Sequence, residues 1–142
     1  MISDELVQAD LIAKLKTISS VTSLLPEGTA GIKEYQWQGD TFQYPAVRFD
    51  LEVNDYEFDE QKMCNLWRVE FSIYIFSQER SSKQCSMIKG LLENYLTGLG
   101  FTGTNAKYSQ MRLERGGNVP SVRQDERTWR SQLRYSTRLT NP

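Results

Sequence analysis

Histidine is absent from this chain of 142 residues. Histidine is the commonest general base in enzymes, a common metal ligand, and the usual partner of a nucleophilic serine or cysteine. Its absence removes most of the catalytic arrangements that a chain of this size could hold. We therefore expect a protein that is not an enzyme and that has no catalytic, cofactor or metal site.

Cysteine is scarce, and long apolar runs are missing. The two cysteines, Cys64 and Cys85, are too few for a disulfide scaffold, so we expect both to be reduced thiols in a protein made in a cytosol. No apolar run approaches the ~18 residues that a membrane-spanning helix needs. The first ten residues are too polar and acidic for a signal peptide, so we expect no membrane partner.

A surplus of charge is also missing, because the net charge of the whole chain is only −1. Nothing in this balance attracts the protein as a whole to nucleic acid or to a membrane. The hydrophobic content of 39% and the charged content of 25% are ordinary for a globular protein. A chain of this length suits a single domain, which can bury a core without a metal or a disulfide.

Two segments have the spacing of amphipathic helices. The first is predicted from Asp4 to Ile18, with Ser3 as its N-cap. The second follows Ser81, which together with Gln84 has the spacing of a capping box, and ends near Gly98. The apolar face of this second helix holds Cys85, Ile88, Leu91, Leu92, Tyr95, Leu96 and Leu99.

Alternation of apolar and polar side chains predicts the strands. The stretch "YPAVRFDLEV" directs Val47, Phe49, Leu51 and Val53 to one face, and Arg48, Asp50 and Glu52 to the other. The stretch "WRVEFSIYIF" has the clearest alternation, and further strands are expected at about 32–38, 107–114 and 127–139, the last two joined by a loop at 116–126. We predict an α+β fold: one domain, residues 1–142, with a mainly antiparallel sheet and two helices packed on one face.

Two motifs that suggest ligand binding have simpler interpretations. The stretch "GLGFTG" lies after a helix instead of between a strand and a helix, so it is a helix end and turn and not a phosphate-binding loop. The acidic residues between Asp50 and Glu60 lack the spacing and the glycine of a calcium loop. They are typical of a solvated strand face and loop.

The charges are unevenly distributed along the chain. Residues 112–142 hold seven arginines and three acids, whereas residues 40–60 hold seven acids and one arginine. Three interpretations stay open: a solvated face, a complementary contact between copies of the protein, and a lining that meets DNA phosphate. The candidate residues for a contact between subunits or a lumen are Arg130, Arg134, Arg138, Asp50, Glu52, Glu57 and Asp59.

The chain resembles the tail terminator proteins of long-tailed bacteriophages, also called tail completion or tail-to-head joining proteins. The resemblance lies in the size and in the opening helix "LVQADLIAKLKTISSVTSLLP". It continues in the aromatic-proline strand entry "YPAVRF" and in the long strand "RVEFSIYIFSQ", which leads through "ERSS" into a helix. An arginine-rich last strand completes it.

The resemblance implies a structural virion protein of the tail or neck region, made in the cytoplasm of the bacterial host. Such proteins form a hexameric ring that caps the tail tube, ends its polymerisation and joins the tail to the head. The implied partners are other copies of the chain, the major tail tube protein, a neck or head-completion protein, and genomic DNA that passes through the lumen without sequence-specific binding. A ring built from one chain needs two different, complementary surfaces on each copy.

Two alternatives accompany this expectation. The first is another head–tail connector, neck or minor tail protein, because such components have similar sequence patterns. The second, from a different class, is a nucleic-acid-binding module that uses the arginine-rich last strand.

Overall fold

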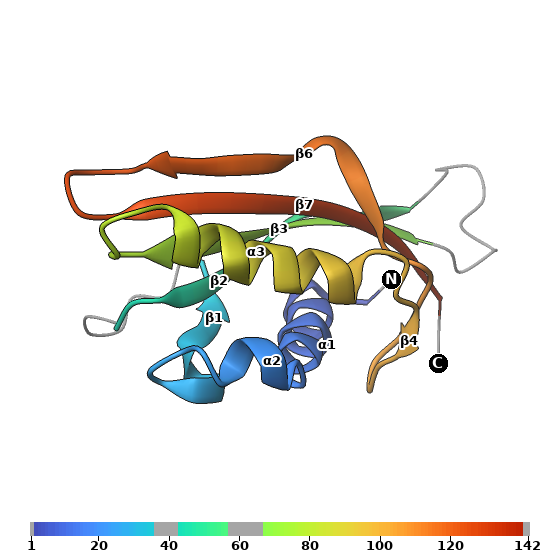
Figure 1. Cartoon of the computed structure of the whole chain (residues 1–142). Helices are drawn as coiled ribbons and strands as arrows, with labels where there is room; N and C mark the ends of the chain where they lie inside the picture. Colours follow the sequence, from blue (N-terminus) through green and yellow to red (C-terminus); the bar gives the residue numbers. More distant parts are fainter. Residues whose placement is uncertain (1, 36–42, 57–66, 141–142) are drawn as a thin grey trace.

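A single sheet organises the chain in the computed structural model, which describes residues 2–35, 43–56 and 67–140 (Figure 1). The strand order is β1-β2-β3-β7-β5-β4, and β6 also pairs with β7. All pairs are antiparallel except β1 and β2, which run parallel. The strands are β1 (Ile32–Glu34), β2 (Ala46–Tyr56), β3 (Trp67–Ser77), β4 (Phe101–Thr102), β5 (Lys107–Tyr108), β6 (Arg112–Arg123) and β7 (Trp129–Thr140).

Both long helices lie on the same face of the sheet, as Figure 1 shows. Helix α1 (Asp4–Lys16) packs against β1 and β2, and helix α3 (Lys83–Leu96) packs against β3 and β7. Two short turns of helix, α2 (Ser19–Thr22) and η1 (Gly28–Gly31), lead from α1 to β1. The predicted α+β fold, with a mainly antiparallel sheet and two helices on one face, is confirmed.

The core lies between the sheet and the two helices. Phe71, in the middle of β3, stacks on Phe49 of β2 with 5.2 Å between ring centroids and on Tyr135 of β7 with 6.0 Å. Burying an apolar side chain of this size contributes about 1.5–3 kcal/mol. The helices add Val7, Leu11, Leu15, Cys85, Ile88, Leu92 and Leu96 to this layer. Cys85 is therefore a buried free thiol, as predicted, while Cys64 lies outside the described residues.

A β-bulge at Glu52 reverses the alternation at the end of β2. Val53 pairs with Glu70 and so lies on the side of the sheet away from the helices, and the prediction that Val53 faces the core is wrong. Asn54 faces the helices instead, and its Nδ2 donates to the carbonyl oxygen of Ile2 at 2.9 Å. A bulge adds one unpaired residue to one strand, and the alternation of a single strand does not reveal it.

The predicted strand at 107–114 is interrupted at Met111. The backbone N–H of Met111 donates to the carbonyl oxygen of Leu99, and its carbonyl oxygen accepts from the N–H of Gly98, both at 2.9 Å. Met111 therefore bonds to the chain that follows α3, and the strand divides into β5 and β6.

The segment 116–126, predicted to be a loop, is mostly strand. β6 continues to Arg123 beside β7, and only residues 124–128 form the turn of the hairpin. Gly116 has a φ of +73°, and a Cβ on Gly117 would lie 2.7 Å from the carbonyl oxygen of Arg134. These two glycines let β6 bend and still pair with β7. The sequence did not predict this strand, because its pattern is dominated by residues that are typical of turns.

The ends of the helices also differ from the prediction. The N-cap of α3 is Ser82 and not Ser81, and the capping box does not form, because Oε1 of Gln84 accepts a hydrogen bond from Oγ of Ser77 at 2.7 Å. Tyr95, predicted on the apolar face of α3, is exposed. Helix α1 ends two residues earlier than predicted, where its last turn tightens into bonds between residues three apart.

Candidate functional site: the polar face of the sheet

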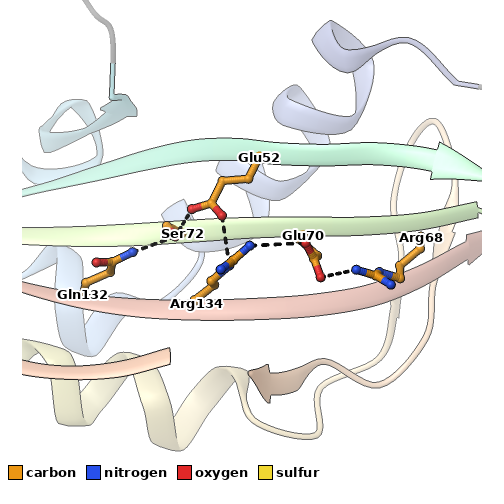
Figure 2. Close-up of polar contacts among 6 residues, drawn as sticks. All are labelled: Glu52, Arg68, Glu70, Ser72, Gln132 and Arg134. Carbon is orange, nitrogen blue, oxygen red and sulfur yellow. Dashed lines mark hydrogen bonds and ion pairs between the residues drawn. The ribbon is translucent and has the colours of Figure 1, made fainter. Parts of the chain in front are cut away.

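The face of the sheet turned away from the helices is polar. Side chains alternate along a strand, so the packing of Phe71 toward the helices turns Glu70 and Ser72 outward. The register then places Ser72 of β3 directly beside Arg134 of β7. Figure 2 shows the resulting row of polar side chains, which crosses β2, β3 and β7.

Arg134 lies at the centre of this row. Its Nε is 2.9 Å from Oε2 of Glu52, and its Nη2 is 3.3 Å from Oε2 of Glu70. The other carboxylate oxygen of Glu70, Oε1, pairs with the guanidinium of Arg68. Glu70 is only 8% exposed, so its charge would be costly without these two guanidinium groups. The charges alternate in sign from β2 to the beginning of β3 (Figure 2).

Ser72 extends the row at the end that Glu52 occupies. Its hydroxyl donates to Oε1 of Glu52 and accepts a hydrogen bond from Nε2 of Gln132 at 3.0 Å. Both oxygens of the Glu52 carboxylate therefore have partners within the chain. We call these six residues the charge row: Glu52, Arg68, Glu70, Ser72, Gln132 and Arg134.

The structure pairs two of the predicted contact residues with each other. Glu52 and Arg134, which we expected on complementary surfaces of different copies, form an ion pair within one chain. Their predicted role in a subunit contact is not tested by this pairing, but each already has a partner. Glu57 and Asp59, two further predicted contact residues, lie outside the described residues.

Asp50 lies on the same polar face, opposite Ser72 in the register of β2 and β3. Partial burial, with the negative charge of Glu52 adding to it, raises the pKa of the Asp50 carboxyl above its ordinary value. Within the described residues no hydrogen bond or ion pair offsets that cost.

Arg130 lies at the other end of the face, among aromatic side chains. Its guanidinium carbon is 5.7 Å from the ring centroid of Tyr74, a cation–π contact. Tyr74 also contacts Tyr35, at 4.7 Å between centroids, and Phe76 at 6.4 Å. Arg130 is thus held against rings and not against a carboxylate.

A polar depression of about 570 Å³ opens beside the charge row, where β3 begins and β7 ends. Arg138, the last of the three predicted arginines of β7, lines it. The full lining is Arg68, Glu70, Ser109, Gln110, Arg112, Glu114, Ser136, Thr137 and Arg138. We call it the basic depression, because one of its two acids, Glu70, is already neutralised by the charge row.

Arg112 is an exposed cation in this depression. It begins β6 opposite Ser136, which places it on the polar face. Among residues 2–35, 43–56 and 67–140, no hydrogen bond or ion pair engages its side chain. Arg112 can therefore accept a carboxylate or phosphate from outside the chain at little cost.

Sequence reasoning did not identify five residues of this face as site residues: Arg68, Glu70, Ser72, Gln132 and Arg112. Arg68 and Glu70 stand on the polar side of the strand with the clearest alternation, and that alternation was the available signal. Arg112 was counted in the basic segment but not identified as a site, because its position depends on the division between β5 and β6 at Met111. The pairing of Arg134 with Glu52 depends on the bulge, which leaves no local signal.

A second buried polar cluster joins α1 to the turn between β4 and β5. Oδ2 of Asp10 accepts hydrogen bonds from the hydroxyl of Tyr108 at 2.9 Å and from the backbone N–H of Asn105 at 3.1 Å. A Cβ on Gly103 would lie 2.7 Å from the same carboxylate oxygen. Burial, and then the hydrogen bond and charge of Asp10, raise the pKa of Tyr108 above the usual tyrosine range. The Asp10 carboxylate therefore connects α1 to the turn between β4 and β5 and to β5 itself.

The described residues contain no group of three or more histidine, cysteine or acidic side chains that could hold a metal ion. In the same part of the chain, no helix combines the length and the apolar character needed to cross a membrane.

The chain resembles solved structures in its fold. No family model matches the chain, and no curated protein matches it. A protein of the virion of a native gene transfer agent particle superimposes with a TM-score of 0.68 at 12% identity, covering 98% of this chain and 100% of its own. A second solved protein, whose name carries no functional description, superimposes with a TM-score of 0.66 at 10% identity, covering 100% of this chain and 99% of its own. At these identities the likeness shows a shared fold over the full length.

Proposed function

We propose that this chain is a structural virion protein of a tailed bacteriophage or a phage-like particle, and specifically a tail terminator subunit. In this proposal six copies form a ring that caps the tail tube, ends its polymerisation and joins the tail to the head. Its partners are other copies of the chain, the major tail tube protein and a neck or head-completion protein. Genomic DNA passes through the lumen without sequence-specific binding, and the role includes no catalytic step.

The observation that carries the proposal is the end-to-end likeness to the protein from the gene transfer agent virion. The superposition leaves almost none of either chain unmatched, so the relation involves a whole subunit and not a common motif. Fold likeness alone is a weak guide to function, because one fold serves many functions. Here it is joined by an independent resemblance of sequence pattern to tail terminator proteins, and both indicate the same kind of particle.

The charge row favours a structural role over the alternative of nucleic-acid binding. Affinity for phosphate depends on cations that release counterions when they bind. Arg134, the middle arginine of β7, is already neutralised by Glu52 and Glu70, and Arg130 lies against Tyr74. The strand is therefore a weaker phosphate surface than its sequence suggests.

A tube-capping assay tests the proposed function. The purified chain is added to the polymerising tail tube protein of the same particle, and tube lengths are measured by electron microscopy. A terminator shortens the tubes in proportion to its concentration and leaves extra density at one end. Tubes of unchanged length, with the chain bound only to isolated heads or connectors, would instead favour the alternative of a neck or connector protein.

A further inference from the structure

Strand β6 lies at an open edge of the sheet. It pairs with β7 along one side, and no strand within residues 2–35, 43–56 and 67–140 pairs with its other side, which we call the β6 edge. Figure 1 shows β6 at the border of the sheet, with no labelled strand beyond it. A long edge strand presents unpaired backbone groups to which a strand of another chain can add.

The side chains of the second half of β6 favour such an addition. Val122 is 43% exposed on the polar face of the sheet, opposite Arg130. Val119 lies on the same face, opposite Gln132. Because β-branched side chains favour extended backbone and an exposed valine gains from burial, this half of β6 needs protection if copies of the chain are not to join through it.

The backbone of β6 provides part of that protection. Pro120 has no N–H and therefore cannot donate a hydrogen bond to an added strand. The register against β7 also shifts twice, between residues 113 and 118 and between residues 119 and 122. Extra residues of this kind bend and twist a strand, so the β6 edge is not the straight surface that a second strand needs.

Helix α3 places a positive charge beside the same segment. Nζ of Lys89 lies 3.4 Å from the carbonyl oxygen of Val119. One turn further along α3, Oε2 of Glu93 accepts a hydrogen bond from Nδ2 of Asn118 at 3.2 Å, so this flank of the helix follows β6. A strand added beside Val119 would remove water from the Lys89 ammonium group, and burying a charge without a counter-charge is costly.

We propose that Lys89 and Pro120 block the addition of a strand from another copy of this chain at the β6 edge. Lysine and proline are the residues that edge strands commonly use for this purpose. The inference does not rest on the proposed function, because it concerns how the chain avoids association through one edge. Any assembly of copies then uses surfaces other than the β6 edge.

Removing both residues tests the proposal. The double variant carries Lys89→Met, which removes the charge and keeps a side chain that suits a helix, and Pro120→Val, which restores an N–H. Its mass by light scattering should be about twice that of wild type at the same concentration, because two open edges can then pair. Its infrared spectrum should show an intermolecular β-sheet band. Each single variant should show a smaller change.

A matched control separates the position of Lys89 from its charge. Lys16→Met removes the same charge from an exposed residue of α1, which packs against β1 and β2. Its mass should equal that of wild type. Association of Lys16→Met to the same extent as the double variant would overturn the proposal, because a general loss of charge would then explain both results.

Hydrogen exchange on the wild-type chain provides a test that does not depend on the folding of a variant. The amide groups of residues 118–123 should exchange at the same rate in dilute and in concentrated protein. Slower exchange of this segment at high concentration would mean that the β6 edge pairs with another copy, and it would overturn the proposal. A double variant that keeps the wild-type circular dichroism spectrum and the wild-type mass would also overturn it. Neither result changes what the tube-capping assay finds for the wild-type chain.

Discussion

Two buried carboxylates, Asp10 and Glu70, connect parts of the structure through polar contacts that apolar patterning does not reveal. Asp10 lies on α1 and accepts hydrogen bonds from the turn between β4 and β5, more than ninety residues further along the chain. Glu70 lies under two guanidinium groups on the opposite face. In both cases one carboxylate has partners on different elements, so its loss affects more than one element.

Replacing Asp10 by alanine should lower the free energy of unfolding by about 2–3 kcal/mol. The substitution leaves the buried hydroxyl of Tyr108 and the N–H of Asn105 without their acceptor, and unpaired buried donors are costly. The measurement is the urea midpoint at pH 7. Asp10→Asn is the control, because it keeps one oxygen acceptor, and it should lose less. Equal losses in the two variants would mean that the carboxylate charge and not its hydrogen bonds stabilises the cluster.

Replacing Asp50 by asparagine should stabilise the protein at neutral pH. The pKa of Asp50 is raised in the folded state by burial and by Glu52, so the folded state binds more protons than the unfolded state as pH rises through the interval above 3.8. The ionised form is therefore penalised at pH 7, and the penalty disappears once the carboxyl is protonated. The urea midpoint of Asp50→Asn should exceed that of wild type at pH 7, and the difference should shrink as the pH falls toward 3.8. A difference that grows at low pH would contradict the pKa direction.

At the scale of elements, the strands whose faces differ most were predicted correctly from the sequence. In β3 and β7 one face is mainly apolar and the other mainly polar, with Tyr74 and Phe76 as the aromatic exceptions on the outer face of β3. The alternation therefore predicts which way most side chains point. Most of β6 was predicted to be a loop because its glycines and Pro120 are typical of turns. Its pairing with β7 stabilises the strand in spite of these residues, and that pairing exists only in the folded chain. The parallel pairing of β1 with β2 was also missed, since three residues carry too little pattern to indicate a partner.

The candidate site was predictable only in part, for the same reason. The shared face of Arg130, Arg134 and Arg138 follows from alternation along one strand. The ion pair between Arg134 and Glu52 cannot be predicted in this way. It depends on the order of strands in the sheet and on the bulge in β2, and both of these arise from pairing between strands that are far apart in the sequence. Which arginines are neutralised in the charge row and which line the basic depression therefore depends on the fold and not on any one segment of the sequence.

The packing of the sheet under the helices gives a prediction for β3. Phe71 is 1% exposed and contacts aromatic rings of β2 and β7, so Phe71→Ala should lower the free energy of unfolding by about 3–5 kcal/mol. The denaturant midpoint measures this directly. Lys107→Ala, at an exposed position of β5, serves as a control and should cost much less. A Phe71→Ala midpoint equal to that of wild type would be inconsistent with this core.

A substitution in helix α3 should raise the stability of the protein instead of lowering it. Gly90 lies in the middle of the helix, and a Cβ added there meets no atom within 4 Å. Because glycine costs a helix interior roughly 0.5–1 kcal/mol relative to alanine, Gly90→Ala should raise the stability of the monomer by about that amount. Thermal melting at low protein concentration is the measurement. A lower melting temperature would show that the space beside Gly90 is filled in solution.

At the scale of the whole molecule, the sheet separates two functions between its faces. The face under α1 and α3 holds the core, and the opposite face holds the charge row and the basic depression. In the proposed ring, the charged surfaces of the second face would be available to neighbouring copies, while the first face holds each copy together. Charges at such a contact determine register and encounter rate more than affinity, which suits assembly in a fixed order.

The most direct measurement for the central claim is the distribution of tail lengths in particles whose gene for this chain has been deleted. A protein that ends tube polymerisation should, when lost, leave headless tails with a broad length distribution extending beyond the wild-type length. A plasmid copy of the gene should restore both a single tail length and head attachment. Tails of uniform, wild-type length in the deletion would contradict the proposal that this chain terminates the tail.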